Sequence, residues 1–125
     1  MIPYQFSFEK LDVWQMARKL AGEVYKKTQT FPTEEKYLLT SQIRRAAVSV
    51  SANIAEGTTR QTARDQAHFT TIAFSSLMEL FNHLIIASDL GYMKEEELAE
   101  YRKTIQPLSF KLSNLKASQV KRIGN

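Results

Sequence analysis

The sequence predicts an all-α protein: an up-down-up-down four-helix bundle that forms a single domain over residues 1–125. Four segments carry apolar residues three or four positions apart, which is the period of an amphipathic helix. The connections between these segments are short and contain proline or glycine. No alternating apolar and polar run bounded by turn residues indicates a strand. Four amphipathic helices with short connections favour neighbouring antiparallel packing, and the length suits one domain.

The first helix is expected over residues 8–30. Its apolar face contains Leu11, Trp14, Ala17, Ala21, Val24, Tyr25 and Thr28. Trp14 lies on this face, so core packing explains it better than stacking on a nucleobase. Phe31-Pro32 should end the helix, because a proline disfavours helical geometry in the residue before it.

The second helix is expected over residues 34–56, with Thr33 as its N-cap and Glu34 and Glu35 at the positive end of the helix dipole. Gly57 should end it in a left-handed conformation. One apolar stripe contains Leu39, Ile43, Ala46, Ala47, Val50 and Ile54. One flank of the stripe is polar, and the opposite side of the helix carries short side chains.

The two other faces of this helix suggest structural roles. Gln42, Asn53 and Glu56 on the polar flank are interpreted as residues that join helices by hydrogen bonds, since buried polar groups need partners. The short side chains on the back of the helix, Ser41, Val48 and Ala52, would let another backbone come close. We therefore expect this strip and Arg45 to lie at a subunit contact or a close helix crossing, with Arg45 paired to a carboxylate.

The third helix is expected over residues 63–90 and the fourth over 95–119, followed by a basic tail over 120–125. Thr62 should cap the third helix and Gly91 should end it. Its apolar residues cover about half the circumference, more than one bundle core needs, so the helix is either central to its own bundle or forms a surface for another subunit. Pro107 lies within the fourth helix and should kink it near Lys103.

Charge is distributed unevenly along the chain. There are 17 basic and 13 acidic residues, a formal net charge of +4. Residues 102–125 contain six basic residues and no acidic one, whereas residues 62–101 contain seven acidic and two basic residues, a net charge of −5. A basic segment can attract nucleic acid, and a solvated helix face with a basic tail explains the same pattern. Charge alone does not separate these two interpretations.

Residues for catalysis or metal binding are sparse. There is no cysteine, which excludes disulfides and thiol chemistry. His68 and His83 each have one carboxylate a helical turn away, Asp65 and Glu79, and this is too few ligands for a metal site. Surface or interface contacts explain these pairs, Glu79 and His83 among them, better than metal binding does. No phosphate-binding loop or nucleophile motif occurs, so no catalytic residue, cofactor or metal is expected and the protein is predicted not to be an enzyme.

The location is predicted to be cytoplasmic. The first twelve residues lack a basic segment followed by an apolar one, so they do not form a signal peptide. No uninterrupted apolar run has the length of a membrane span, and no membrane association is expected.

The segment from Tyr37 to Gly57 resembles the signature of a bacterial family of four-helix-bundle proteins, first noticed inside intervening sequences of large-subunit ribosomal RNA genes. The matching residues are Leu39, Thr40, Gln42, Ile43, Arg44, Arg45, Ala46, Ser49, Val50, Asn53, Ile54, Ala55, Glu56 and Gly57. The segments 8–11, 13–14, 72–73, 76–77, 79–80 and 90–92 are also similar to the family, so the resemblance spans about residues 6–117. The chain departs from the family at Ser51, where a proline is common, and at Lys94, where a serine is usual.

This resemblance implies a fold and an assembly more than an activity. Relatives form ring-shaped homopentamers of up-down bundles, so a homopentamer is expected here. The accessory proteins of diversity-generating retroelements are distantly similar, and they bind nucleic acid and a reverse transcriptase. For most of the family no activity is established.

Two functions of different class follow. The first is a non-enzymatic, homo-oligomeric accessory protein that binds RNA or DNA through its basic residues, mainly by phosphate contacts. The candidate contact residues are Arg60, Arg64, Lys103, Lys111, Lys116, Lys121 and Arg122. The second is a protein-interaction scaffold for an unidentified partner, in which the basic tail is incidental.

Overall fold

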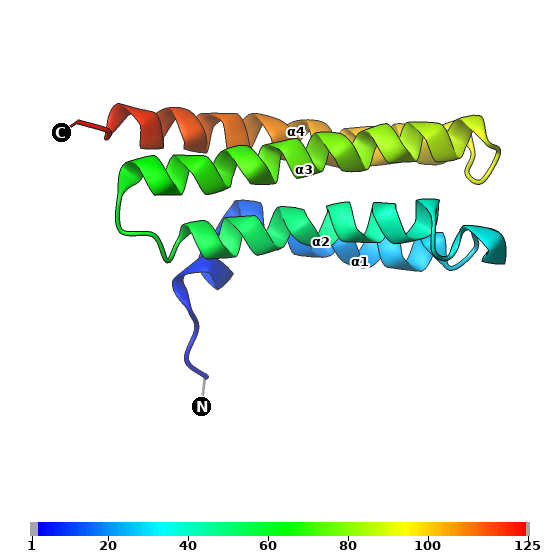
Figure 1. Cartoon of the computed structure of the whole chain (residues 1–125), viewed down its shortest axis with the longest axis horizontal. Coiled ribbons are helices and arrows are strands. Elements are labelled where there is room, and N and C mark those ends of the chain that lie inside the picture. The colour runs from blue at the N-terminus through cyan, green and yellow to red at the C-terminus, as the bar shows by residue number, and fades with distance from the viewer. Residues whose placement is uncertain (1–2, 125) are drawn as a thin grey trace.

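The structure is a computed structural model that describes residues 3–124. Its elements are the 3-10 turn η1 (Ser7–Lys10), α1 (Asp12–Thr28), the 3-10 turn η2 (Thr33–Glu35), α2 (Leu39–Gly57), α3 (Ala63–Asp89) and α4 (Glu95–Lys121). The four helices run alternately up and down in two layers, with α1 and α2 in one and α3 and α4 in the other (Figure 1). Residues 3–124 contain no strand. The predicted all-α, four-helix fold is therefore confirmed.

The core lies between the two layers and runs along the whole bundle. α2 packs against both α1 and α3, and α3 packs against α4. The largest side chains that are fully buried come from all four helices: Leu20, Val24, Ile43, Val50, Leu77, Leu80, Leu84, Leu108 and Leu112. Their three- and four-residue spacing within each helix accounts for the amphipathic pattern of the sequence.

The first helix begins later than expected, at Asp12 instead of Phe8. Residues 7–10 form the turn η1, and Leu11 has an extended backbone with φ −77° and ψ 130°. The Glu9 carboxylate accepts a hydrogen bond from the Phe6 backbone N–H at 2.7 Å, which stabilises this separate turn.

The helical spacing predicts Tyr25 on the core face of the first helix, but its side chain is 43% exposed, beneath the guanidinium of Arg44.

The second helix also begins later, at Leu39, so the predicted N-cap role of Thr33 is wrong. Thr33 instead opens the turn η2, and the backbone breaks at Leu38, with φ −118° and ψ −109°. A contact distant in sequence fixes this turn: the Tyr92 hydroxyl donates to the Glu35 carboxylate at 2.7 Å. The Tyr92 ring also packs on the ring of Phe31.

Gly57 does not take the left-handed conformation that was predicted for it. Among the described glycines only Gly91 and Gly124 have positive φ. Gly57 is the last residue of α2, and a Cβ built on it would lie 3.2 Å from the Cβ of Phe69. Its lack of a side chain therefore lets α3 approach the end of α2, which is a packing role and not a conformational one.

The ends of α3 and α4 lie close to their predicted positions. Thr62 caps α3 by accepting the backbone N–H of Asp65 at 3.1 Å, and Gly91 follows the helix with φ 81°. The Glu97 carboxylate accepts the Lys94 backbone N–H at 2.9 Å at the start of α4. α4 continues through Pro107 and ends at Lys121, so the first two residues of the expected tail are helical; Asn125 lies outside the described residues.

α3 is long and apolar enough to cross a membrane by length and composition, with a mean hydropathy of 1.3 over its most apolar stretch. One such helix is weak evidence for a membrane protein, because the central helix of a bundle has the same length and composition. Here α3 packs against α2 and α4 and contributes Leu77, Leu80 and Leu84 to the core.

Candidate nucleic-acid interface

Five of the seven candidate basic residues gather at one end of the bundle. We call this group, Arg60, Arg64, Lys116, Lys121 and Arg122, the basic end. The turn between α2 and α3 and the C-terminal end of α4 lie at the same end of the bundle (Figure 1). Together with these five cations, residues 56–66 and 113–124 contain only two carboxylates, those of Glu56 and Asp65. The basic end therefore has a net positive charge.

Gln66 links the two segments of the basic end. Its Nε2 donates to the backbone carbonyl of Arg60 at 3.0 Å, and its Oε1 accepts from Nη2 of Arg122 at 3.0 Å. The guanidinium of Arg60 also lies 4.6 Å from the ring centre of Phe69, and Glu56 is 3.9 Å away. These contacts hold Arg60 and Arg122 in place on opposite sides of one glutamine.

The other three basic residues surround this pair. Arg64 and Arg122 line a polar hollow of about 420 Å³ between the start of α3 and the end of α4. Lys116 is exposed and lines a smaller cleft of about 150 Å³ along α3 and α4 with Thr70 and Thr71. Lys121 is exposed in the last turn of α4. Arg64 and Arg122 therefore lie at the positively charged first turn of α3, and the two lysines lie along the last turns of α4.

Lys103 and Lys111 do not join the basic end. Lys103 is 18 residues before Lys121 on one helix, which corresponds to a separation of about 27 Å at the helical rise. Lys103 contacts Glu100 at 3.1 Å, and Lys111 forms an ion pair with Asp12 of α1. The structure thus separates these two lysines from the other candidates and gives each a carboxylate partner.

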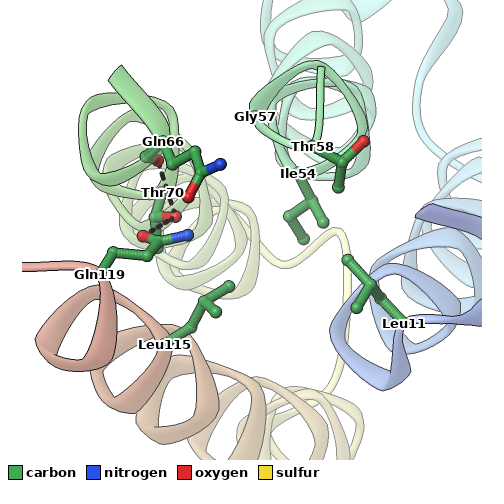
Figure 2. Close-up of a pocket in the computed structure, with 8 residues that line it drawn as sticks. All are labelled: Leu11, Ile54, Gly57, Thr58, Gln66, Thr70, Leu115 and Gln119. Carbon is green, nitrogen blue, oxygen red and sulfur yellow. Dashed lines mark hydrogen bonds between the residues drawn. The ribbon is translucent and has the colours of Figure 1, made fainter. Parts of the chain in front are cut away.

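A cavity of about 180 Å³ opens beside the basic end. It is lined by Leu11, Ile54, Gly57, Thr58, Gln66, Thr70, Leu115 and Gln119, which come from all four helices or their ends. Figure 2 shows the aliphatic side chains of Leu11, Ile54 and Leu115 on one side and the polar group of Gln66, Thr70 and Gln119 on the other. We call this space the end cavity.

The polar side of the end cavity is built around a buried glutamine. Gln119 is 7% exposed, and its Oε1 is 2.7 Å from the Thr70 hydroxyl, which is also 3.1 Å from the Gln66 backbone carbonyl. A threonine hydroxyl carries one proton and cannot donate fully to both acceptors. Turning the Gln119 amide over would let Nε2 donate to Thr70 and Thr70 donate to Gln66.

Either orientation of the Gln119 amide leaves one of its atoms unused. That atom makes no hydrogen bond with the described residues and points into the end cavity (Figure 2). It is a donor in one orientation and an acceptor in the other. No sequence pattern indicates Gln66, Thr70 or Gln119, because they are ordinary helix residues that meet only in the folded bundle.

The polar flank of α2 has mixed surroundings. Asn53 donates to the Ser49 carbonyl at 2.8 Å and to its hydroxyl at 3.0 Å, and the Ser49 and Ser76 hydroxyls are 2.8 Å apart, joining α2 to α3. Gln42 and Glu56 are exposed. Asn53 therefore lies in a hydrogen-bonded cluster between helices, whereas Gln42 and Glu56 lie outside it.

The back of α2 faces outward. Val48 is 44% exposed and Ala52 is also exposed, so no close helix crossing occurs there within the described chain. Arg45 is exposed and forms no ion pair within residues 3–124. The expected carboxylate partner of Arg45 is thus not found among the described residues of the chain. Glu79 is exposed and 3.3 Å from His83 on α3.

A second apolar region lies on the outside of α3 and α4. Met78, Phe81, Arg102, Ile105, Gln106, Ser109 and Phe110 line a groove of about 250 Å³ there. Phe110 is 60% exposed and Met78 is 39% exposed, while the Arg102 guanidinium lies 4.8 Å from the ring centre of Phe81. We call this the outer groove.

The shifted ionisable groups lie away from the basic end. The Lys27 ammonium, 2.6 Å from the Glu97 carboxylate, lowers the pKa of Glu97 by hydrogen bonding to it. Burial, followed by the negative charges of Glu23 and Glu97, raises the pKa of Tyr101 to about 12. Within residues 3–124 no group of three or more histidines, cysteines or carboxylates could hold a metal ion.

The architecture and the basic end define a small all-α bundle with a positively charged end. The sequence model of the family described as 23S rRNA-intervening sequence protein matches residues 9–114, and the chain belongs to this family. The resemblance seen in the sequence is therefore confirmed.

Among solved structures, the fold is similar to a protein of unknown function from the S23 ribosomal protein family of Bacteroides thetaiotaomicron. The TM-score is 0.62 and the identity is 18%, over 90% of this chain and 99% of that chain. At this identity the likeness concerns the fold alone. No curated protein matches the chain.

Proposed function

We propose that the protein is a non-enzymatic, homo-oligomeric accessory protein of the cytoplasm that binds single-stranded RNA or DNA through the basic end. The gathering of five basic side chains at one end of the bundle, where α3 starts and α4 ends, is the observation that carries this proposal. Positive side chains next to backbone N–H groups at a helix start suit phosphate oxygens. Gln66 holds the guanidinium of Arg122, whereas Phe69 and Glu56 hold that of Arg60, so both arginines would meet phosphates with little loss of side-chain freedom.

The expected binding is mainly electrostatic. Each basic residue that neutralises a phosphate of a single strand adds about −0.7 to the slope of log Kobs against log salt. Removing two contacts should therefore make the slope shallower by about 1.4. Contacts limited to phosphates carry little sequence information, so RNA and DNA strands of mixed sequence should bind with similar affinity.

Fluorescence anisotropy with a labelled single strand tests this from about 50 to 200 mM salt. The double variant Arg60→Gln with Arg64→Gln is compared with Lys19→Gln with Lys26→Gln, which removes the same charge from exposed positions of α1. The first pair should weaken binding and flatten the slope, and the second pair should do so much less. Equal effects would show that only net charge matters, and absence of binding at low salt would refute the proposal.

Self-association is proposed through the back of α2. Val48 and Ala52 leave an exposed surface of short side chains beside Arg45, and small residues allow the backbones of two subunits to approach. The resemblance to the family implies five copies in a ring. Light scattering should give a mass several times that of the chain, and Val48→Asp should lower it. Leu90→Asp, at an equally exposed position at the end of α3, is the control.

A protein-interaction scaffold is the second candidate, and the outer groove favours it. Exposed Met78 and Phe110 beside Arg102 form an apolar surface with a cation at its edge. Aromatic residues, methionine and arginine are enriched at protein interfaces. An oligomer of full mass that binds no strand at low salt would favour this second function.

A further inference from the structure

We propose that the end cavity receives one unpaired base of the strand whose phosphates lie on the basic end. This inference rests on the proposed function and adds a specific feature to it. A protein that only neutralises phosphates would not need an aliphatic hollow with a buried amide next to its arginines. The cavity supplies a place for the part of a nucleotide that the arginines do not contact.

The size and walls of the end cavity suit a single ring. A buried cavity of about 150 Å³ lined by aliphatic and aromatic side chains holds benzene, and the end cavity measures about 180 Å³. A pyrimidine ring is about as large as benzene. Leu11, Ile54 and Leu115 would contact the faces of such a ring (Figure 2).

The polar side of the cavity suits the edge of a base. Gln119 is more than nine-tenths buried and directs one unused amide atom into the space. Bases carry both carbonyl oxygens and ring or amino N–H groups on their edges, so a base can match a donor or an acceptor at this position. The unused Gln119 atom is accessible from the cavity, and a purely apolar ligand would bury it without a partner, which is costly.

The charges at the cavity explain why the ring should belong to a nucleotide. Gln66 lines the end cavity, accepts a hydrogen bond from the Arg122 guanidinium and donates one to the Arg60 backbone carbonyl, so both arginines are neighbours of a residue in the cavity wall. A phosphate attached to the inserted nucleoside would therefore meet positive charge at once. Bases can enter such a pocket only when they are unpaired, so the protein should prefer single strands to duplexes.

Two oligonucleotides of about twelve nucleotides, within the usual range of site sizes, separate base insertion from phosphate contact. One is oligothymidylate, and the other is an abasic strand with the same number of phosphates. The wild-type protein should bind oligothymidylate at least about tenfold more tightly, since burying an apolar group of similar size has an effect of this order. Methyl-labelled protein should also show nuclear Overhauser contacts between the thymine methyl group and the Leu115 and Ile54 methyl groups.

Variants that fill the cavity provide the second part of the test. Leu115→Phe should reduce the affinity for oligothymidylate to that for the abasic strand, whereas Leu90→Phe at the exposed end of α3 should not. Gln119→Leu should weaken oligothymidylate binding about two- to tenfold, the effect of one hydrogen bond, with Gln106→Leu as the exposed control. Circular dichroism checks the fold, and Leu11→Phe fills the cavity from another element if Leu115→Phe does not fold.

The two proposals fail in different ways. Absence of binding to both strands refutes the nucleic-acid function and the base pocket together. Equal affinity for the two strands, or preference for oligothymidylate that Leu115→Phe and Leu11→Phe leave intact, refutes the base pocket alone. Loss of the preference in the filled variants, with the salt slope unchanged, is the result expected.

Discussion

Replacing Thr70 with valine should destabilise the bundle by removing the partner of a buried amide. Valine keeps the branched shape of threonine, so the change removes the hydroxyl and little else. The Gln119 amide, 7% exposed and 2.7 Å from that hydroxyl, would then face a methyl group. An unsatisfied buried polar group costs about 1–3 kcal/mol, and we expect a loss of that size in the free energy of unfolding.

Replacing the other partner, Gln119, should destabilise the bundle less. Comparing the two substitutions therefore tests which group is left unsatisfied. The Thr70 hydroxyl lies 3.1 Å from the Gln66 backbone carbonyl. In Gln119→Leu the hydroxyl can still donate to this carbonyl, so no buried polar group lacks a partner. The double variant Thr70→Val with Gln119→Leu leaves no unsatisfied amide. Removing both partners of a hydrogen bond can be nearly neutral, so the double variant should be more stable than Thr70→Val alone, with a coupling energy of about 1–2 kcal/mol.

Urea unfolding followed by circular dichroism, at one protein concentration for all variants, measures these differences. Thr71→Val is the matched control, because Thr71 is the next residue on α3 and bonds only to the Ala67 carbonyl, at 2.9 Å. Its cost should stay below about 0.5 kcal/mol, the usual limit for a substitution outside a buried network. Equal losses for Thr70→Val and Thr71→Val, or strictly additive effects in the double variant, would refute the role given to Gln119.

Three further substitutions test the fold. Gly22→Ala should stabilise the protein by about 0.5–1 kcal/mol in urea unfolding, because Gly22 lies inside α1 with nothing near its position for a Cβ; a loss would show that another subunit covers it. Leu84→Ala should cost about 2–5 kcal/mol, since Leu84 is 1% exposed, while Leu90→Ala at an exposed position should cost little. The Lys27 contact lowers the pKa of Glu97 from its ordinary value of 4.5. The ion pair therefore stabilises the fold above about pH 4.5, and this stabilisation is lost as the pH falls through the lowered pKa. Wild type and Glu97→Gln should therefore differ at pH 6, by less than about 1 kcal/mol because the pair is partly exposed, and the difference should shrink as the pH falls below 4.5; a constant difference would contradict this.

The positions of α3 and α4 follow from the sequence because their ends depend on neighbouring residues. The Thr62 hydroxyl and the Glu97 carboxylate each bond to a backbone N–H three residues away. The start of α2 depends instead on Tyr92, which is 57 residues from Glu35 and holds the turn η2 by its hydroxyl. Local capping rules indicated a helix from Thr33 and contain no information about such a contact.

The candidate site was predictable in charge but not in shape. The excess of basic residues after residue 102 is visible in the sequence, and so are Arg60 and Arg64 beside the turn. The separation of Lys103 from this group depends on how far one continuous helix carries it from Lys121, and that of Lys111 depends on its ion pair with Asp12 of α1. The end cavity depends on Gln66, Thr70 and Gln119 meeting across two helices, a contact that no spacing within one helix indicates.

The position of the basic residues at one tip of the bundle matters for any ring whose axis runs along the helices. Rotation about that axis keeps every copy of Arg60, Arg64 and Arg122 on the same face, at equal height, and leaves the other face without them. A strand lying across this face would meet one cluster after another, and after the first contact each later one would be intramolecular. Effective concentrations in the millimolar range then replace the concentration in solution. Clusters that bind weakly one at a time could thus retain a strand for long periods, and a strand too short to reach two of them would dissociate quickly.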